Sequence, residues 1–231
     1  MKVRVKFRKY GPVRFIGHLD VMRFFQKAIR RAEIDITYTG GFSPHQIMSF
    51  AAPLGVGLES NGEYMDIEVG SAASSQDMIQ RLNTASVPGI EIISARVLPD
   101  TAGNAMASVA AAEYTVRFRE GREPSFDYAG ELDGFMGQDQ IMITKETKKG
   151  THEMDLKPGI YELSFSDGAF HMLVDASSAG NIKPSMVIAA YLLFHGENLS
   201  ENALLITRED LFTRAGEGRK LISLDEVGAD L

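Results

Sequence analysis

The spacing of apolar and charged residues changes along the first third of the chain, and each change predicts an element. Residues 2–8 alternate between apolar and basic side chains, which is typical of a half-buried strand. From His18 to Ala32 the apolar residues recur with the 3.6-residue period of a helix. The buried face of this helix is predicted to consist of Met22, Phe25, Ala28, Ile29 and Ala32.

A second helix and three more strands complete a first module. The strands are predicted at 36–39, 63–69 and 90–98, and the helix runs from a serine cap at 74 or 75 to about residue 86. The order strand, helix, strand, strand, helix, strand over residues 1–98 is that of the split βαβ, or ferredoxin-like, arrangement.

The remainder of the chain predicts a second module of similar order. Residues 99–111 are rich in Ala and nearly uncharged, and we expect a linker there. The turn Ser166-Asp167-Gly168 between two apolar runs indicates a hairpin. The other predicted elements are strands at 114–118, 141–147, 160–165, 169–174 and 204–207, and helices at 126–135 and from Pro184 onward. We therefore expect an α+β protein of two tandem ferredoxin-like (βαββαβ) modules, 1–98 and 112–231, the second with an extra strand and a C-terminal tail.

Composition excludes several classes of chemistry. The 231 residues include no cysteine, which removes disulfides, thiolate metal sites and a thiol nucleophile. No apolar run approaches the roughly 20 residues of a membrane-spanning helix. We expect a cytoplasmic protein that has no contact with a membrane.

Positive charge is concentrated near the N-terminus although the net charge is −7. Residues 1–31 contain ten Lys or Arg and a single acid, Asp20. Such asymmetry is typical of a surface for nucleic acid or an acidic partner, and a merely solvated face is the alternative. Four cations of the predicted first helix lie opposite its buried face, and we expect them to contact phosphates. They are Arg23, Lys27, Arg30 and Arg31. Cations expected nearby are Arg4, Lys6, Arg8, Lys9 and Arg14.

A second candidate site follows from topology. If the strand at 36–39 runs parallel to the first strand, the loop after it lies beside the start of the first helix. His18 and His45 would then meet at one rim of the sheet. No metal site is assigned, because the histidines lack the short spacing of a ligand pair. The predicted loop site consists of Asp20, Phe42, Ser43, His45, Ser60 and Glu63.

Residues 14–69 carry a set of short motifs that resembles one family. The motifs are Gly17-His18-Leu19-Asp20, Arg30-Arg31-Ala32, Gly41-Phe42-Ser43-Pro44-His45, Ser49-Phe50, Pro53-Leu54, and Glu63-Tyr64 with Asp66. Weaker similarities are Asp155-Leu156-Lys157-Pro158, Lys183-Pro184 and Thr207-Arg208. The chain is similar to the radical SAM-linked protein family of unknown function (DUF2344), and Gln46 departs from the proline expected after His45. The resemblance implies a radical SAM protein as partner and an RNA-related role, but no reaction.

Three functions are compatible with these features. The first is a non-catalytic accessory protein that binds RNA, tRNA or rRNA, and presents it to a radical SAM enzyme, with no cofactor in this chain. The second is a metal-independent RNA-processing nuclease in which His18 and His45 act as base and acid on a ribose 2′-hydroxyl. The third is a protein-only adaptor whose basic face docks an acidic surface of its partner.

Overall fold

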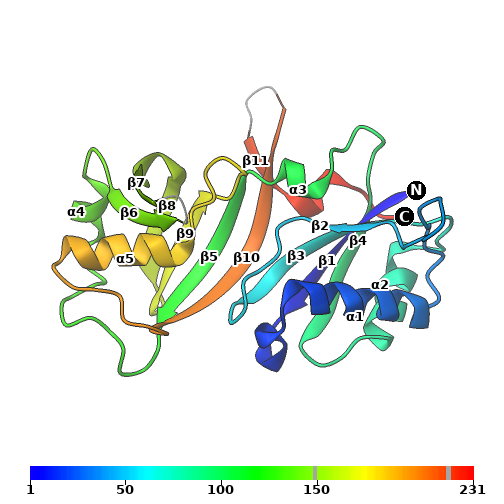
Figure 1. Ribbon diagram of the computed structural model, residues 1–231, viewed down its shortest axis with the longest axis horizontal. Helices are drawn as coiled ribbons and strands as arrows, with labels where there is room; N and C mark the ends of the chain where they lie inside the picture. Colours follow the sequence, from blue (N-terminus) through cyan, green and yellow to red (C-terminus); the bar gives the residue numbers. More distant parts are fainter. Residues whose placement is uncertain (148–149, 217–219) are drawn as a thin grey trace. The chain divides into compact units, whose positions relative to one another are not determined.

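The computed structural model describes residues 1–147, 150–216 and 220–231 of an α+β chain. The chain forms two units, each with its own internal contacts (Figure 1). Unit 1 consists of Met1–Ala110 and Arg208–Leu231, and unit 2 of Ala111–Thr207. None of the helices in the described residues is long and apolar enough to cross a membrane.

Unit 1 is built on an antiparallel sheet in which β1 pairs with both β3 and β4. The short strand β2 also pairs antiparallel with β3, and β3 has β10 as a further neighbour. The strands are β1 (Lys2–Lys9), β2 (Met48–Phe50), β3 (Glu59–Glu68), β4 (Ile90–Val97), β10 (Leu204–Ala215, in unit 1 from Arg208) and β11 (Lys220–Ser223). The helical segments are α1 (His18–Arg31), α2 (Ser75–Thr84), α3 (Ala105–Ser108), η1 (Gly11–Phe15) and η3 (Leu224–Val227).

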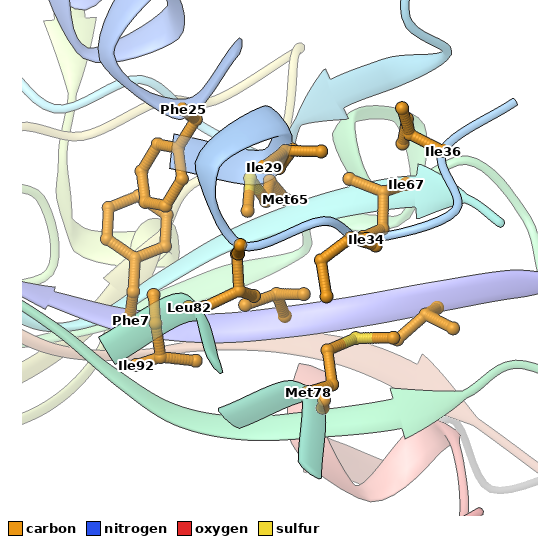
Figure 2. Packing of buried hydrophobic residues seen from close by; sticks show 14 of the residues in the cluster. Phe7, Phe25, Ile29, Ile34, Ile36, Met65, Ile67, Met78, Leu82 and Ile92 are labelled. Carbon is orange, nitrogen blue, oxygen red and sulfur yellow. The ribbon is translucent and has the colours of Figure 1, made fainter. Parts of the chain in front are cut away.

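One face of this sheet packs against α1 and α2 and forms the core of unit 1 (Figure 2). The rings of Phe7 on β1 and Phe25 on α1 meet edge to face with centroids 4.6 Å apart. Burial of such a side chain contributes about 1.5–3 kcal/mol. The buried face of α1 is as predicted except at its start, where Val21 is buried and Met22 is half-buried. This packing fixes which face of α1 points to solvent.

The other face of the sheet carries charged side chains of β1, and the C-terminal segment covers it. The Arg4 side chain is only 1% exposed and donates two hydrogen bonds to Asp66, of 2.8 and 3.0 Å. It also donates to the carbonyl oxygen of Leu224, at 3.3 Å. Lys6 forms an ion pair of 3.1 Å with Asp210 on β10. The buried Arg4 and the half-buried Lys6 are thereby each paired with an acid, as burial of charge requires.

The C-terminal boundary differs from the expected division of the chain. The sequence predicted that 112–231 form the second module, whereas Arg208–Leu231 belong to unit 1. One reason is charge pairing, because Lys6 on β1 and Arg96 on β4 form ion pairs with Asp210 and Asp225 of this segment. The segment 99–111, expected to be a linker, contains the short helix α3 and the first residue of β5.

Unit 2 contains a sheet in which β9 lies between β5 and β8, with antiparallel pairing on both sides. The predicted hairpin is confirmed, since β8 and β9 are joined by Asp167 and Gly168, both with positive φ (49° and 71°). The elements are β5 (Ala111–Phe118), α4 (Leu132–Met136), β6 (Met142–Thr147), β7 (Gly150–Asp155), η2 (Lys157–Gly159), β8 (Ile160–Ser166), β9 (Ala169–Asp175) and α5 (Pro184–Phe194).

Two predicted elements of unit 2 differ from the structure. The strand predicted at 141–147 pairs with β7 in a separate two-stranded sheet. The helix predicted over 126–135 is reduced to α4, five residues long. Asp127 explains the loss, because its carboxylate accepts hydrogen bonds of 3.3 Å from the backbone of Ala129 and Gly130. Such local bonds compete with helix formation.

Candidate functional site

The exposed face of α1 carries all four cations predicted to contact phosphates. Arg23, Lys27, Arg30 and Arg31 are exposed, and the buried residues of α1 hold them away from the core. Arg23 forms an ion pair of 3.3 Å with Asp20, three residues earlier. Arg30 and Arg31 donate instead to backbone carbonyls, those of Gln26 (3.2 Å) and Ala85 (2.9 Å). Within the described residues, Arg23 is therefore the one cation of these four with an acidic partner.

The five cations expected to extend this basic surface do not do so. Arg4 and Lys6 bind acids on the opposite face of the sheet, as described above. Arg8 pairs with Glu91 at 3.1 Å and Arg14 pairs with Glu59 at 3.0 Å. Lys9 is 2% exposed and donates to the carbonyl oxygen of Ile16 at 2.9 Å. Of the nine cations predicted to form this surface, only the four on α1 are exposed.

A loop of defined conformation lies next to these cations. Tyr38 and Gln46 form an isolated antiparallel bridge, and backbone N–H groups of Thr39 and Ile47 donate across the loop at 2.9 Å each. The hydroxyl of Thr39 accepts from the backbone N–H of His45 and lies 3.1 Å from its Nδ1. Two aromatic rings remain exposed on this loop, Tyr38 at 48% and Phe42 completely.

The loop and the second half of α1 line an open hollow of about 200 Å³. Its lining residues are Gln26, Arg30, Tyr38, Pro44, His45 and Gln46. At its floor, Gln46 is 6% exposed and its Nε2 donates to the carbonyl oxygen of Gln26 at 3.2 Å. We call the surface formed by Arg23, Lys27, Arg30, Tyr38, Phe42 and His45 the α1–loop face.

The structure gives His18 and His45 different neighbours, contrary to the expected common rim. The ring of His18 meets Phe50 edge to face at 5.0 Å, whereas His45 lines the hollow with Gln26. His18 and Gln26 are eight residues apart on α1, which is about 12 Å along a helix axis. The reason is the position of the second strand. It is Met48–Phe50 rather than 36–39, so the loop precedes the strand instead of following it.

The remaining predicted loop residues divide between surface and interior. Asp20 and Ser43 are exposed, whereas Ser60 and Glu63 are buried in unit 1. Glu63 forms an ion pair with Arg208, which also donates to the carbonyl oxygen of Ala52 at 2.7 Å. Ser60 accepts a hydrogen bond of 3.1 Å from the backbone N–H of Gly62. Ser60 and Glu63 thus lie apart from the α1–loop face.

Lys9 belongs to the same buried polar cluster as Glu63 and Arg208. Burial lowers the pKa of Lys9, the carboxylate of Glu63 opposes this shift, and the guanidinium of Arg208 adds to it. Sequence analysis missed Arg208 as a member, because it lies 145 residues from Glu63. Its place in the weak Thr207-Arg208 similarity was the one available signal. The cluster joins the C-terminal segment to the first part of unit 1.

Comparison with known proteins agrees with the motifs of residues 14–69. A family model described as an uncharacterized protein conserved in bacteria (DUF2344) matches residues 2–184. The chain belongs to this family, since the match covers well over half of it. No curated protein matches the chain. In the described parts of the chain, no three His, Asp or Glu side chains are grouped so that they could hold a metal ion.

Proposed function

We propose that the protein is an accessory protein that binds RNA, tRNA or rRNA, through the α1–loop face and presents it to a radical SAM enzyme. The observation that carries this proposal is the juxtaposition of exposed cations and exposed aromatic rings on an ordered loop; among the described residues, Lys27 and Arg30 of this face have no acidic partner. Cations bind phosphates, and aromatic rings stack on unpaired bases, which is the combination found in proteins that bind single-stranded nucleic acid.

The topology of unit 1 supports RNA binding on the side of the sheet that carries α1. We propose that unit 1 is a ferredoxin-like module, because β1 pairs with β3 and β4, β2 pairs with β3, and α1 and α2 pack on one face of the sheet. RNA-binding modules of the RRM type use the open face of such a sheet. Here that face holds Arg4 and Lys6, already paired with Asp66 and Asp210. RNA would therefore approach from the helical side. We extend the proposal of a ferredoxin-like module, with an additional strand, to unit 2.

The proposal of a radical SAM partner rests on the resemblance of residues 14–69 to the radical SAM-linked family. Radical SAM chemistry depends on an iron–sulfur cluster, and such clusters are held by cysteine thiolates. This sequence contains no cysteine. In this proposal the modifying chemistry belongs to the partner, and the α1–loop face positions the RNA.

Charge reversal on α1 tests the proposal. The variant Arg23→Glu/Lys27→Glu/Arg30→Glu should lose retention of a labelled RNA hairpin in a filter assay. The matched control reverses three exposed cations of unit 2, with the substitutions Arg117→Glu/Arg122→Glu/Lys183→Glu. Circular dichroism would verify that both variants remain folded.

Two outcomes of this assay test RNA binding, and a copurification experiment tests the protein-only adaptor. Loss in the α1 variant alone supports RNA binding by the α1–loop face. Equal retention by the α1 variant and the wild type refutes it. Salt-sensitive copurification with a radical SAM protein, without any RNA retention, identifies a protein-only adaptor instead.

A further inference from the structure

The hollow beside α1 combines features that phosphate binding alone does not need. It is bounded on one side by α1, through Gln26 and Arg30, and on the other by the loop residues Tyr38, Pro44 and His45. The cations Arg23 and Lys27 lie on α1 before Arg30, so a backbone that follows α1 would bring a nucleotide past this hollow.

We propose that this hollow receives a single unpaired nucleobase, so that the RNA recognised is a loop, bulge or single strand rather than a continuous duplex. The inference rests on the proposed function and names the class of RNA that the same face would bind. Sequence-specific proteins recognise RNA mainly where bases are unpaired and can be turned out onto aromatic side chains.

The walls of the hollow suit a flat aromatic ligand. The ring of Tyr38 is half exposed at the rim, where a base could stack against it. Arg30 lines the hollow from α1, and a planar guanidinium can stack on a base or bind its phosphate. A hollow of about 200 Å³ is small compared with the usual drug-sized pockets, which fits one ring system rather than a larger ligand.

The floor of the hollow has a polar group with unused hydrogen-bonding capacity. Gln46 is 6% exposed, and its Nε2 is used by the carbonyl oxygen of Gln26. Its Oε1 is buried and has no hydrogen-bond partner among the described residues. Buried amide oxygens are normally satisfied. An amino or imino N–H on the edge of an inserted base is the kind of donor that this oxygen lacks.

The hollow is preformed, because bonds inside the loop hold its shape. The backbone N–H of His45 donates to Thr39 Oγ1 at 3.2 Å, and the N–H of Thr39 donates to the carbonyl oxygen of His45 at 2.9 Å. The bridge between Tyr38 and Gln46 sets the spacing of the wall and the floor. Preorganisation of this kind lowers the entropic cost of binding.

The test compares two RNAs and two substitutions of Tyr38. The ligands are a single-stranded oligonucleotide with one 2-aminopurine and a fully paired duplex of equal length, measured by fluorescence anisotropy at one salt concentration. We expect the wild type to bind the single strand more tightly than the duplex, with quenching of 2-aminopurine. The Tyr38→Ala variant cannot stack this base, and its affinity for the single strand should be about 5- to 150-fold lower than that of the wild type. Tyr38→Phe keeps the ring and should bind as the wild type does.

The control is Tyr10→Ala, which removes a half-exposed ring on the loop before α1 and should change neither affinity. Equal affinity for both RNAs, or equal weakening of both by Tyr38→Ala, would overturn the nucleobase pocket and leave RNA binding by α1 intact. No binding of either RNA would instead overturn the proposed function itself.

Discussion

The salt dependence of RNA binding gives the most quantitative test of the basic face on α1. Each phosphate neutralised by a cation contributes about −0.7 to the slope of log K against log salt concentration for a single strand. Lys27, Arg30 and Arg31 have no acidic partner among the described residues, whereas Arg23 is partly compensated by Asp20. Three contacts correspond to a slope of about −2.1, or about a 20-fold loss of affinity between 50 and 200 mM salt.

The perturbation is Lys27→Gln/Arg30→Gln/Arg31→Gln, measured by anisotropy titrations of a single-stranded RNA from 50 to 200 mM salt. Glutamine has nearly the helix propensity of lysine and arginine, so α1 should be retained. We expect the slope of the variant to be less negative than that of the wild type by about 2. Identical slopes in the two proteins would refute the reasoning. The control, Arg117→Gln/Arg122→Gln/Lys183→Gln in unit 2, should keep the wild-type slope.

Two further predictions concern stability. Burial, followed by the carboxylates of Glu131 and Asp127, raises the pKa of Tyr191 to about 12 from 10.0. The neutral phenol therefore stabilises the fold fully below pH 10, and this stability is lost as the pH rises from 10 to 12. Urea titrations should show that the wild type loses about 1 kcal/mol more than Tyr191→Phe between pH 10 and 11, and equal losses would contradict the assignment. Arg4→Leu leaves the carboxylate of Asp66 without its cation and removes the hydrogen bond to the carbonyl oxygen of Leu224. We expect a loss of about 3–5 kcal/mol in urea unfolding of the full chain. A loss below about 1 kcal/mol would show that Arg4 does not hold β1, β3 and the C-terminal segment together.

Elements with a strong period were predictable from the sequence. The alternation of β1 and the apolar stripe of α1 place Phe7 and Phe25 in the core, as the structure confirms. The second strand was misplaced because the β-prone residues 36–39 form only isolated bridges. The strand that pairs with β3, Met48–Phe50, is three residues long and too short to show a period.

Long-range pairing of charged residues was not predictable. Arg4 and Leu224 are 220 residues apart, and nothing in the local pattern of either indicates their contact. For this reason the sequence overestimated the basic surface and assigned the C-terminal segment to the second module. The exposure of Lys27 and Arg30 was predictable, since it depends only on the period of α1. The hollow was not, because its floor residue Gln46 becomes buried only when the loop packs on α1.

The most direct test of the α1–loop face is to identify where RNA touches the protein in cells. Ultraviolet crosslinking, followed by mass spectrometry of the crosslinked peptides, reports the contacted residues without a prior choice of RNA. We expect crosslinks at Tyr38, Phe42 or within His18–Arg31. Crosslinks confined to unit 2, or a protein recovered without RNA, would contradict the account.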